Sequence, residues 1–312
     1  MDRRNFLKAG VLGTIALTAM PHSVEAAPRR RRGKMKAKRV LIVALDAIRV
    51  DGLQQAHTPV LDGLMSKGSV SLATRSVMPS ITLPNWTSHL CGSGPEQHGV
   101  ADNKWEYGKA KLPGIVLDED GYYPSIFKVL KDNVPGVKTA FYRNWNKLMR
   151  PYNKKYFDDE ILLPFGEYKA NYDRAFEFMK ENKDVPSLTF LYTVHTDKAG
   201  HNYGWMSPEY ITSIEEADVE IGKLFEKMKA EGIYDDTHIF FLTDHGGIGK
   251  SHGKVSKEEM VIPWSLTGPG IKSGFTMEES NSVTNTACVI ARLFGVEVPS
   301  FWIGQIPESI FR

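Results

Sequence analysis

Acidic and imidazole side chains follow three apolar stretches of the sequence, at 40–45, 188–194 and 238–242. Three carboxylates and three histidines lie directly after these stretches or a few residues further on: Asp46, Asp197, His201, Asp244, His245 and His252. Carboxylate and imidazole ligands without a thiolate suit zinc or a similar divalent ion. One tetrahedral ion does not need six protein ligands, whereas two ions with three ligands each keep positions open for substrate. The pattern therefore predicts a site for two divalent ions, with zinc as the expected metal.

Each of these residues, taken singly, has a purely structural explanation. An Asp after a strand is often a helix N-cap, and Asp244-His245-Gly246-Gly247 is compatible with a tight turn. In open α/β sheets, however, ligands bind outside the carboxyl ends of the strands. Since the polar residues follow three separate strands, we favour a metal centre over independent caps and turns.

Thr82 is the candidate nucleophile of this centre. It lies in the segment from Pro79 to Asn85, at the start of an expected helix at 84–91. The N–H groups and the positive dipole end of a helix N-terminus favour phosphate. A cation lowers the pKa of a hydroxyl that it binds, so no histidine base is needed. The alternative is that Thr82 only caps the helix, and the adjacent ligands favour the catalytic role.

The elements that position these residues alternate between strands and helices. Apolar, β-branched runs predict buried strands at 40–45, 188–194, 238–242 and 261–266. Apolar residues at three- and four-residue spacing predict helices at about 58–67, 84–91, 123–132, 169–182, 208–230 and 283–294. This alternation predicts a doubly wound α/β fold, with a mostly parallel sheet and helices on both faces.

The stretch at 104–165 interrupts the alternation. It is rich in Tyr, Trp, Lys, Asn, Pro and Gly, and its periodicity is broken. We expect part of it to form a small cap or a set of long loops over the sheet edge. Neither an internal repeat nor a second domain is evident, so residues 40–312 are expected to form a single catalytic domain.

Residues 1–26 have the features of a signal peptide. A twin-arginine pair, Arg3 and Arg4, precedes an uncharged, mostly apolar stretch from Ala9 to Met20, and Val24-Glu25-Ala26 offers a cleavage site. The apolar stretch is shorter than the roughly 20 residues that a transmembrane helix needs. We expect export by the Tat route to the periplasm or the medium, without a transmembrane anchor in the mature chain.

The charge of the chain is unevenly distributed. Eight Lys and Arg residues lie between 27 and 39, and residues 40–312 carry a net charge of −7. We expect 27–39 to be a basic, disordered leader. No basic stripe interleaved with aromatics is present, so a nucleic acid partner is not expected. Cys91 and Cys288 are the only cysteines, which excludes a disulfide framework and leaves a single bridge open.

Taken together, the motifs resemble the nucleotide pyrophosphatase/phosphodiesterase branch of the alkaline phosphatase superfamily. The similar segments keep the family's order and cover most of 40–270: Leu45-Asp46, Pro79 to Asn85 with Ser88 and Gly92, Pro95 to Gly99 with Asn103, Asp197 to His201, Asp244-His245-Gly246, and His252-Gly253. The resemblance implies an alkaline phosphatase-like fold and a small phosphate-ester substrate. It also implies hydrolysis of phosphodiester or pyrophosphate bonds in two steps, through a phosphothreonine on Thr82.

The resemblance assigns roles to individual residues. Asp197, His201 and His252 would hold one zinc ion. Asp46, Asp244 and His245 would hold the other, together with Thr82. The Asn103 side-chain amide and the Thr82 backbone N–H would hold a phosphoryl oxygen, a donor pair aimed at developing negative charge.

Several alternatives stay open at this stage. Phosphomonoesterase and phosphonate hydrolase activities belong to the same superfamily. A sulfatase is rejected, because the segment beginning at Cys91 lacks the arginine and the spacing of the C/S-x-P/A-x-R motif. Leu83 follows the nucleophile where nucleotide-cleaving members often carry an aromatic, so stacking on a base would fall to Trp86, Trp105 or Tyr107. A binding module without turnover would not need Thr82. The oligomeric state and the natural substrate are not determined by the sequence.

Overall fold

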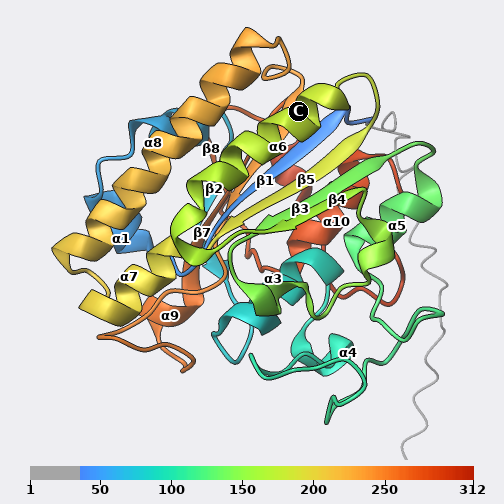
Figure 1. The fold of residues 1–312 in the computed structure, drawn as a ribbon, viewed down its shortest axis with the longest axis horizontal. Coiled ribbons are helices and arrows are strands. Elements are labelled where there is room, and N and C mark those ends of the chain that lie inside the picture. The colour runs from blue at the N-terminus through green and yellow to red at the C-terminus, as the bar shows by residue number, and fades with distance from the viewer. Residues whose placement is uncertain (1–35) are drawn as a thin grey trace, which may run out of the picture. The chain divides into compact units, whose positions relative to one another are not determined.

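The computed structural model describes residues 36–312, and its centre is a sheet of eight strands (Figure 1). The strands are β1 (Arg39–Leu45), β2 (Ser69–Arg75), β3 (Lys138–Arg143), β4 (Asp159–Leu162), β5 (Ser187–Thr193), β6 (Thr237–Leu242), β7 (Val261–Thr267) and β8 (Phe275–Thr276). Their order across the sheet is β4-β3-β5-β1-β6-β7-β2-β8. The four strands predicted from the sequence are confirmed as β1, β5, β6 and β7.

The register of the central strands brings their carboxyl ends together. β1 lies between β5 and β6 and pairs with both in parallel, so that Leu45 is opposite Thr193 and Ala44 is opposite Leu242. Among the described strands only β7 runs against the others. The loops that follow β1, β5 and β6 therefore leave the same edge of the sheet.

Helices cover both faces of the sheet, as the sequence predicts. They are α1 (Val50–Gln55), α2 (Pro59–Ser66), α3 (Thr82–Cys91), α4 (Pro95–His98), α5 (Ile126–Asn133), α6 (Lys169–Glu181), α7 (His195–Tyr203), α8 (Pro208–Ala230), α9 (Lys257–Met260) and α10 (Asn285–Leu293). The six predicted helices correspond to α2, α3, α5, α6, α8 and α10. Short 3-10 helices lie at Asn146–Met149, Lys154–Tyr156, Phe165–Glu167 and Glu308–Ile310.

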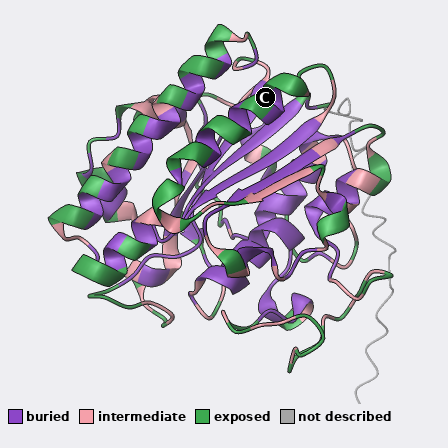
Figure 2. Ribbon diagram, in the orientation of Figure 1, coloured by how far each residue is buried: buried purple, intermediate pink, exposed green. Residues whose placement is uncertain are grey.

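Alternate residues of β1 belong to two different hydrophobic cores. Val40, Ile42 and Ala44 pack with α3, α5 and α10. Leu41, Val43 and Leu45 pack with α1, α2, α6 and α8. Figure 2 shows the result, with the central strands buried and the long helices buried on one side and exposed on the other. A strand buried on both faces needs a continuous apolar run, which is why β1 was recognisable in the sequence.

The stretch at 104–165 contributes more to the sheet than the sequence suggests. It contains α5, β3 and β4, and β3 pairs in parallel with β5 and β4. The described loop at 101–125 contains no helix or strand, and 144–158 contains only short 3-10 helices. The expected cap or long loops therefore correspond to these two segments. β3 (KTAFYR) has too few apolar residues in a row to stand out as a buried strand.

The boundary of the predicted basic leader also needs correction. The predicted signal peptide at 1–26 and most of the predicted leader at 27–39 lie outside the described residues, but Arg39 opens β1 and is almost fully buried. Its guanidinium pairs with Asp236 at 2.7 Å and donates to the Lys183 carbonyl at 2.9 Å. A buried guanidinium is tolerated because these partners satisfy its two terminal nitrogens.

The described residues form one compact unit around this sheet. None of the helices within 36–312 is long and apolar enough to span a membrane. Cys91 and Cys288, whose pairing the sequence leaves open, are free thiols, and both are buried.

Candidate metal centre and nucleophile

The carboxyl edge of the sheet brings the predicted ligands together. Asp46 directly follows β1, Asp197 lies in the first turn of α7 after β5, and Asp244 and His245 follow β6. Asp46, Asp244 and His245 are completely buried, and Asp197 is 9% exposed. Since the three strands are parallel neighbours, residues that are distant in the sequence meet here.

The first group of candidate ligands consists of Asp46, Asp244 and His245. His245 Nε2 lies 3.2 Å from Asp244 Oδ2 and 3.5 Å from Asp46 Oδ1. One ligand atom from each side chain falls within 4.8 Å of the others, close enough for a single ion. The structure thus brings together the three residues that the resemblance assigns to one ion.

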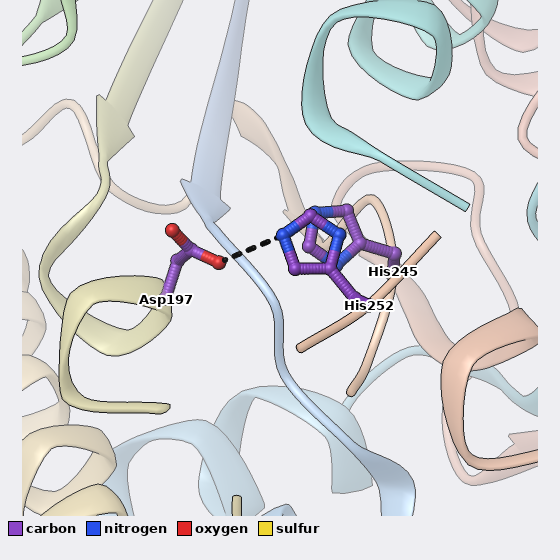
Figure 3. Close-up of side chains that lie close together, drawn as sticks. All are labelled: Asp197, His245 and His252. Atoms are coloured by element: carbon purple, nitrogen blue, oxygen red, sulfur yellow. Dashed lines mark ion pairs between the residues drawn. The ribbon is translucent and has the colours of Figure 1, made fainter. Parts of the chain in front are cut away.

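The second group consists of Asp197, His201 and His252, and Figure 3 shows Asp197 and His252 beside His245 of the first group. Asp197 Oδ1 lies 3.6 Å from His252 Nε2 and 3.4 Å from His201 Nε2, and the two histidine nitrogens are 3.2 Å apart. His201 is the most exposed of these side chains, at 41%. His245 is also within reach of Asp197 and His252, and its ring stacks on that of His252 with centroids 3.9 Å apart. The two groups therefore adjoin at His245.

Backbone carbonyls set the tautomer of all three histidines. Nδ1 of His201, His245 and His252 contacts the carbonyl oxygens of Lys250, Gly246 and Ser80 at 3.0, 2.8 and 3.0 Å. A carbonyl can only accept, so Nδ1 carries the proton and Nε2 directs a lone pair at the carboxylates. A second ring nitrogen held in this way is typical of metal-ligating histidines.

Unpaired buried oxygens indicate that cations fit the site. Asp46 Oδ1, Asp197 Oδ1 and Asp244 Oδ2 are buried and have no hydrogen-bond partner among residues 36–312. Burial raises the pKa of Asp46 and Asp244 well above the usual range, and neighbouring carboxylates raise it further. Burial also lowers the pKa of His245, which keeps the ring neutral. Unpaired carboxylates in a buried site are costly unless a cation compensates them, so these donors fit divalent ions.

The other oxygens of the two innermost carboxylates are held by the protein. Tyr192, on β5, donates its phenolic O–H to Asp46 Oδ2. The backbone N–H of Ala47 donates to Asp244 Oδ1 at 3.0 Å. Each carboxylate thus keeps one oxygen fixed and one free. Neither Tyr192 nor Ala47 was identified from the sequence, because neither has a type or spacing that signals chemistry.

The candidate nucleophile lies directly against the first group. Thr82 is the first residue of α3, and its Oγ1 is 3.3 Å from His245 Nε2. Its side chain is 4% exposed. Asn85 braces the segment before it, accepting from the Val77 N–H at 2.7 Å and donating to the Ile81 carbonyl at 2.9 Å. The Thr82 hydroxyl is therefore held at the edge of the ligand cluster.

The N-terminus of α3 offers one unused backbone donor beside this hydroxyl. The Leu83 N–H donates to Asn103 Oδ1 at 2.8 Å, Pro84 has no N–H, and the Asn85 N–H donates to the Ile81 carbonyl. The Thr82 N–H has no acceptor among residues 36–312. Since Leu83 fixes the Asn103 carbonyl oxygen, the Asn103 amide nitrogen is the group that remains to donate.

The aromatic residues considered for base stacking differ in how far their side chains are exposed. Trp86 is completely buried and packs edge-on against Phe190 and Tyr192, so it cannot stack on a substrate. Trp105 is partly buried against the core beneath α3. Tyr107 is 51% exposed and stacks on Tyr122 with ring centroids 4.5 Å apart. Tyr107 is therefore the most accessible of the three candidates.

Comparison with known proteins agrees with the motifs. The chain matches the family described as type I phosphodiesterase / nucleotide pyrophosphatase over residues 40–259. An uncharacterised pyrophosphatase/phosphodiesterase of Schizosaccharomyces pombe is 31% identical over 227 residues, covering 66% of this chain and 44% of that protein. Ectonucleotide pyrophosphatase/phosphodiesterase family member 1 of Homo sapiens is 26% identical over 227 residues, covering 66% of this chain and 23% of that protein. The chain spans less than half the length of these two relatives.

A solved structure shares the fold. Murine ectonucleotide pyrophosphatase/phosphodiesterase 5 superposes with a TM-score of 0.72 at 16% sequence identity, over 88% of this chain and 100% of that one. At this level of identity the likeness concerns the fold alone.

Proposed function

The chain belongs to the type I phosphodiesterase / nucleotide pyrophosphatase family, and we propose on this basis that it hydrolyses phosphodiester or pyrophosphate bonds of small substrates, with Thr82 as the nucleophile. The observation that carries the proposal is the Thr82 hydroxyl, 3.3 Å from His245 Nε2 at the edge of a cluster of buried, unpaired carboxylate oxygens.

Two groups of residues would hold a pair of divalent ions. Asp46, Asp244 and His245, with Thr82, would hold one, and Asp197, His201 and His252 would hold the other. Zinc suits this set of carboxylate and neutral imidazole donors. When bound, such ions would neutralise the carboxylates, stabilise negative charge on the phosphoryl group and lower the pKa of the Thr82 hydroxyl.

Thr82 would act in two steps. Its hydroxyl gives its proton to solvent, Oγ1 forms a bond to phosphorus, and the bond from phosphorus to the departing alcohol or phosphate oxygen breaks, after which that oxygen takes a proton from solvent. The phosphothreonine then loses its phosphoryl group to water, which breaks the bond to Oγ1 and restores the hydroxyl. The position of Thr82 at the N-terminus of α3 supports this role, because the helix dipole favours an anion there.

Two donors would hold a non-bridging oxygen of the phosphoryl group. The Thr82 N–H is without an acceptor in the described chain, and the Leu83 N–H orients Asn103 so that its amide nitrogen is free to donate. Donors held in place before the reaction stabilise developing negative charge without reorganising.

Replacing the nucleophile tests the proposal directly. We expect Thr82→Ala to retain about two zinc ions per chain, yet to lose at least about a thousandfold in cleavage of bis-p-nitrophenyl phosphate. Thr82→Ser should recover part of the activity, because it restores a hydroxyl. Zinc is measured by elemental analysis and cleavage by release of p-nitrophenol.

A matched control lies one turn further along the same helix. Thr87 is buried and donates to the Leu83 carbonyl at 2.6 Å, so Thr87→Val also removes a buried hydroxyl from α3. It should keep most of the activity. A Thr82→Ala variant as active as the parent would show that the nucleophile is another group.

Comparing two substrates separates the proposed activity from its main alternative within the superfamily. The parent is assayed on bis-p-nitrophenyl phosphate and on p-nitrophenyl phosphate at equal zinc loading. We expect a higher kcat/KM on the diester. A strong preference for the monoester would instead make the chain a phosphomonoesterase that uses the same residues.

A further inference from the structure

Trp205 contacts elements that carry both groups of candidate ligands. Its side chain is 6% exposed. Two glycines pack directly against the indole. A Cβ on Gly200 would come within 2.5 Å of it, and a Cβ on Gly247 within 2.3 Å. Gly200 belongs to α7, which carries Asp197 and His201, and Gly247 follows His245. Any side chain at either glycine would displace the indole.

The indole ring borders the two histidines of the second group. Its centroid is 5.1 Å from that of His201 and 5.7 Å from that of His252, with interplanar angles of 79° and 71°. The Trp205 backbone N–H donates to the Gly249 carbonyl at 2.8 Å, in the loop that leads to His252. Edge-on packing of this kind restricts the orientation of both imidazoles.

The indole N–H is linked to the first group of candidate ligands through a hydrogen bond to the backbone of Ala47. Nε1 donates to the Ala47 carbonyl at 3.1 Å, and Tyr210 donates its hydroxyl to the same oxygen at 2.9 Å. Ala47 directly follows Asp46 and has a φ of 61°, a left-handed conformation that is unfavourable for alanine. The Ala47 N–H in turn donates to Asp244 Oδ1. Trp205 and Tyr210 thus hold the turn that carries Asp46 and orients Asp244.

We propose that Trp205 is a positioning residue that couples the two ion sites, holding the Ala47 turn with its N–H and the His201 and His252 rings with its indole. This inference rests on the proposed function, because it takes both groups to be ion sites. In this proposal the affinities of both ion sites depend on the Trp205 side chain, which binds neither ion.

Trp205→Phe is the direct test, since it removes the N–H and shortens the ring while keeping an aromatic side chain. Metal-free protein is titrated with zinc in competition with a chromophoric chelator, which reports the number of ions and both affinities. We expect two ions still to bind, each with an affinity lowered about 10- to 100-fold, as for other residues that orient metal ligands.

Tyr210→Phe isolates one half of the coupling. It removes a donor to the Ala47 carbonyl and leaves the indole contacts with His201 and His252 in place. We expect a smaller loss, about tenfold, at one ion only. This conservative variant keeps the inference testable if Trp205→Phe does not fold.

Trp302→Phe is the matched control. Trp302 is equally buried, donates its indole N–H to the Pro124 carbonyl at 3.3 Å and packs against Gly92, away from the candidate ligands. Metal-free Trp302→Phe and Trp205→Phe should unfold at similar temperatures, while Trp302→Phe binds zinc like the parent.

The outcomes distinguish the two proposals. A parent that bound no zinc would overturn the proposed function and the coupling with it. If the parent binds two ions and Trp205→Phe matches it, or weakens one ion alone, the coupling is wrong while the proposed function stands. Unchanged zinc affinity in Tyr210→Phe would likewise exclude the Ala47 turn as the link.

Discussion

Asp46, Asp244 and the three histidines of the candidate site are held in the same way. Another group of the protein forms a hydrogen bond with one of the two polar atoms of each side chain, and the second polar atom stays free. Tyr192 holds one oxygen of Asp46, the Ala47 N–H holds one oxygen of Asp244, and backbone carbonyls hold Nδ1 of the histidines. The remaining atoms face each other at the sheet edge. Such ligands are oriented before an ion binds, so little reorganisation opposes binding.

Tyr192 offers a prediction at this scale. Tyr192→Phe keeps the buried ring but removes the only side-chain donor to the Asp46 carboxylate in the part of the chain that the structure describes. The carboxylate then loses a hydrogen bond to a charged group, worth about 1.5–3 kcal/mol. We expect kcat/KM on bis-p-nitrophenyl phosphate to fall about 10- to 100-fold.

The control for this variant is another buried tyrosine. Tyr172 is 3% exposed and belongs to the core on the α6 and α8 side, and its hydroxyl has no hydrogen-bond partner within the described residues. Tyr172→Phe should leave kcat/KM unchanged. Equal losses in the two variants would indicate a general effect of removing a buried hydroxyl.

Among the elements, α3 has the most direct bearing on the chemistry. All its residues are buried, and its polar side chains bond to its own backbone or to neighbouring elements. Ser88 contacts Nε2 of His98, at the end of α4, at 3.1 Å, and His98 Nδ1 accepts the Val100 N–H at 3.0 Å. The Val100 bond requires His98 to be neutral, since a protonated imidazole has no acceptor nitrogen.

His98 leads to a pH prediction for this junction. Burial lowers its pKa to about 3, against 6.5 for an exposed histidine. Between these values the unfolded chain binds a proton that the folded chain does not, so the contribution of His98 to stability falls as pH falls below about 6.5. We expect the difference in unfolding free energy between the parent and His98→Gln to shrink by up to about 1.4 kcal/mol per pH unit.

The measurement is urea unfolding of both proteins at pH 7.5, 6.0 and 5.0, at the same zinc concentration. Other titrating groups cancel in the difference, because the two chains share them. A constant difference across this range would mean that His98 titrates normally in the folded protein.

At the scale of the whole molecule, the sheet concentrates negative charge at one edge. Three buried carboxylates with unpaired oxygens meet there, in a domain whose residues 40–312 already carry a net charge of −7. Folding without cations must bury these groups uncompensated, whereas ions that bind only the folded state stabilise it by mass action.

Metal removal is therefore expected to destabilise the entire domain. With zinc at a thousand times its dissociation constant, each of the two ions contributes about 4 kcal/mol, so chelation should lower Tm by roughly 15 °C. Differential scanning calorimetry with and without a chelator measures the shift. Asp197→Asn should show a smaller shift in Tm. If the chelator did not change the Tm of the parent, this would argue against ions as part of the folded structure.

Much of the architecture followed from local patterns in the sequence. The runs that became β1, β5 and β6 are apolar because both faces of a central parallel strand are buried, and that requirement is visible residue by residue. β2 and β3 were missed because polar residues interrupt them. Arg39 was assigned to the leader because its partner Asp236 is distant in the sequence.

The sequence by itself determined which residue types follow which strands, and hence the candidate ligands and Thr82. Only the tertiary structure decided which atoms of these residues face one another. Tyr192 meets Asp46 across 146 positions of sequence, and Trp205 meets Ala47 across 158. Such contacts depend on strand order and register, which arise from the packing of the whole sheet, and no local periodicity contains them.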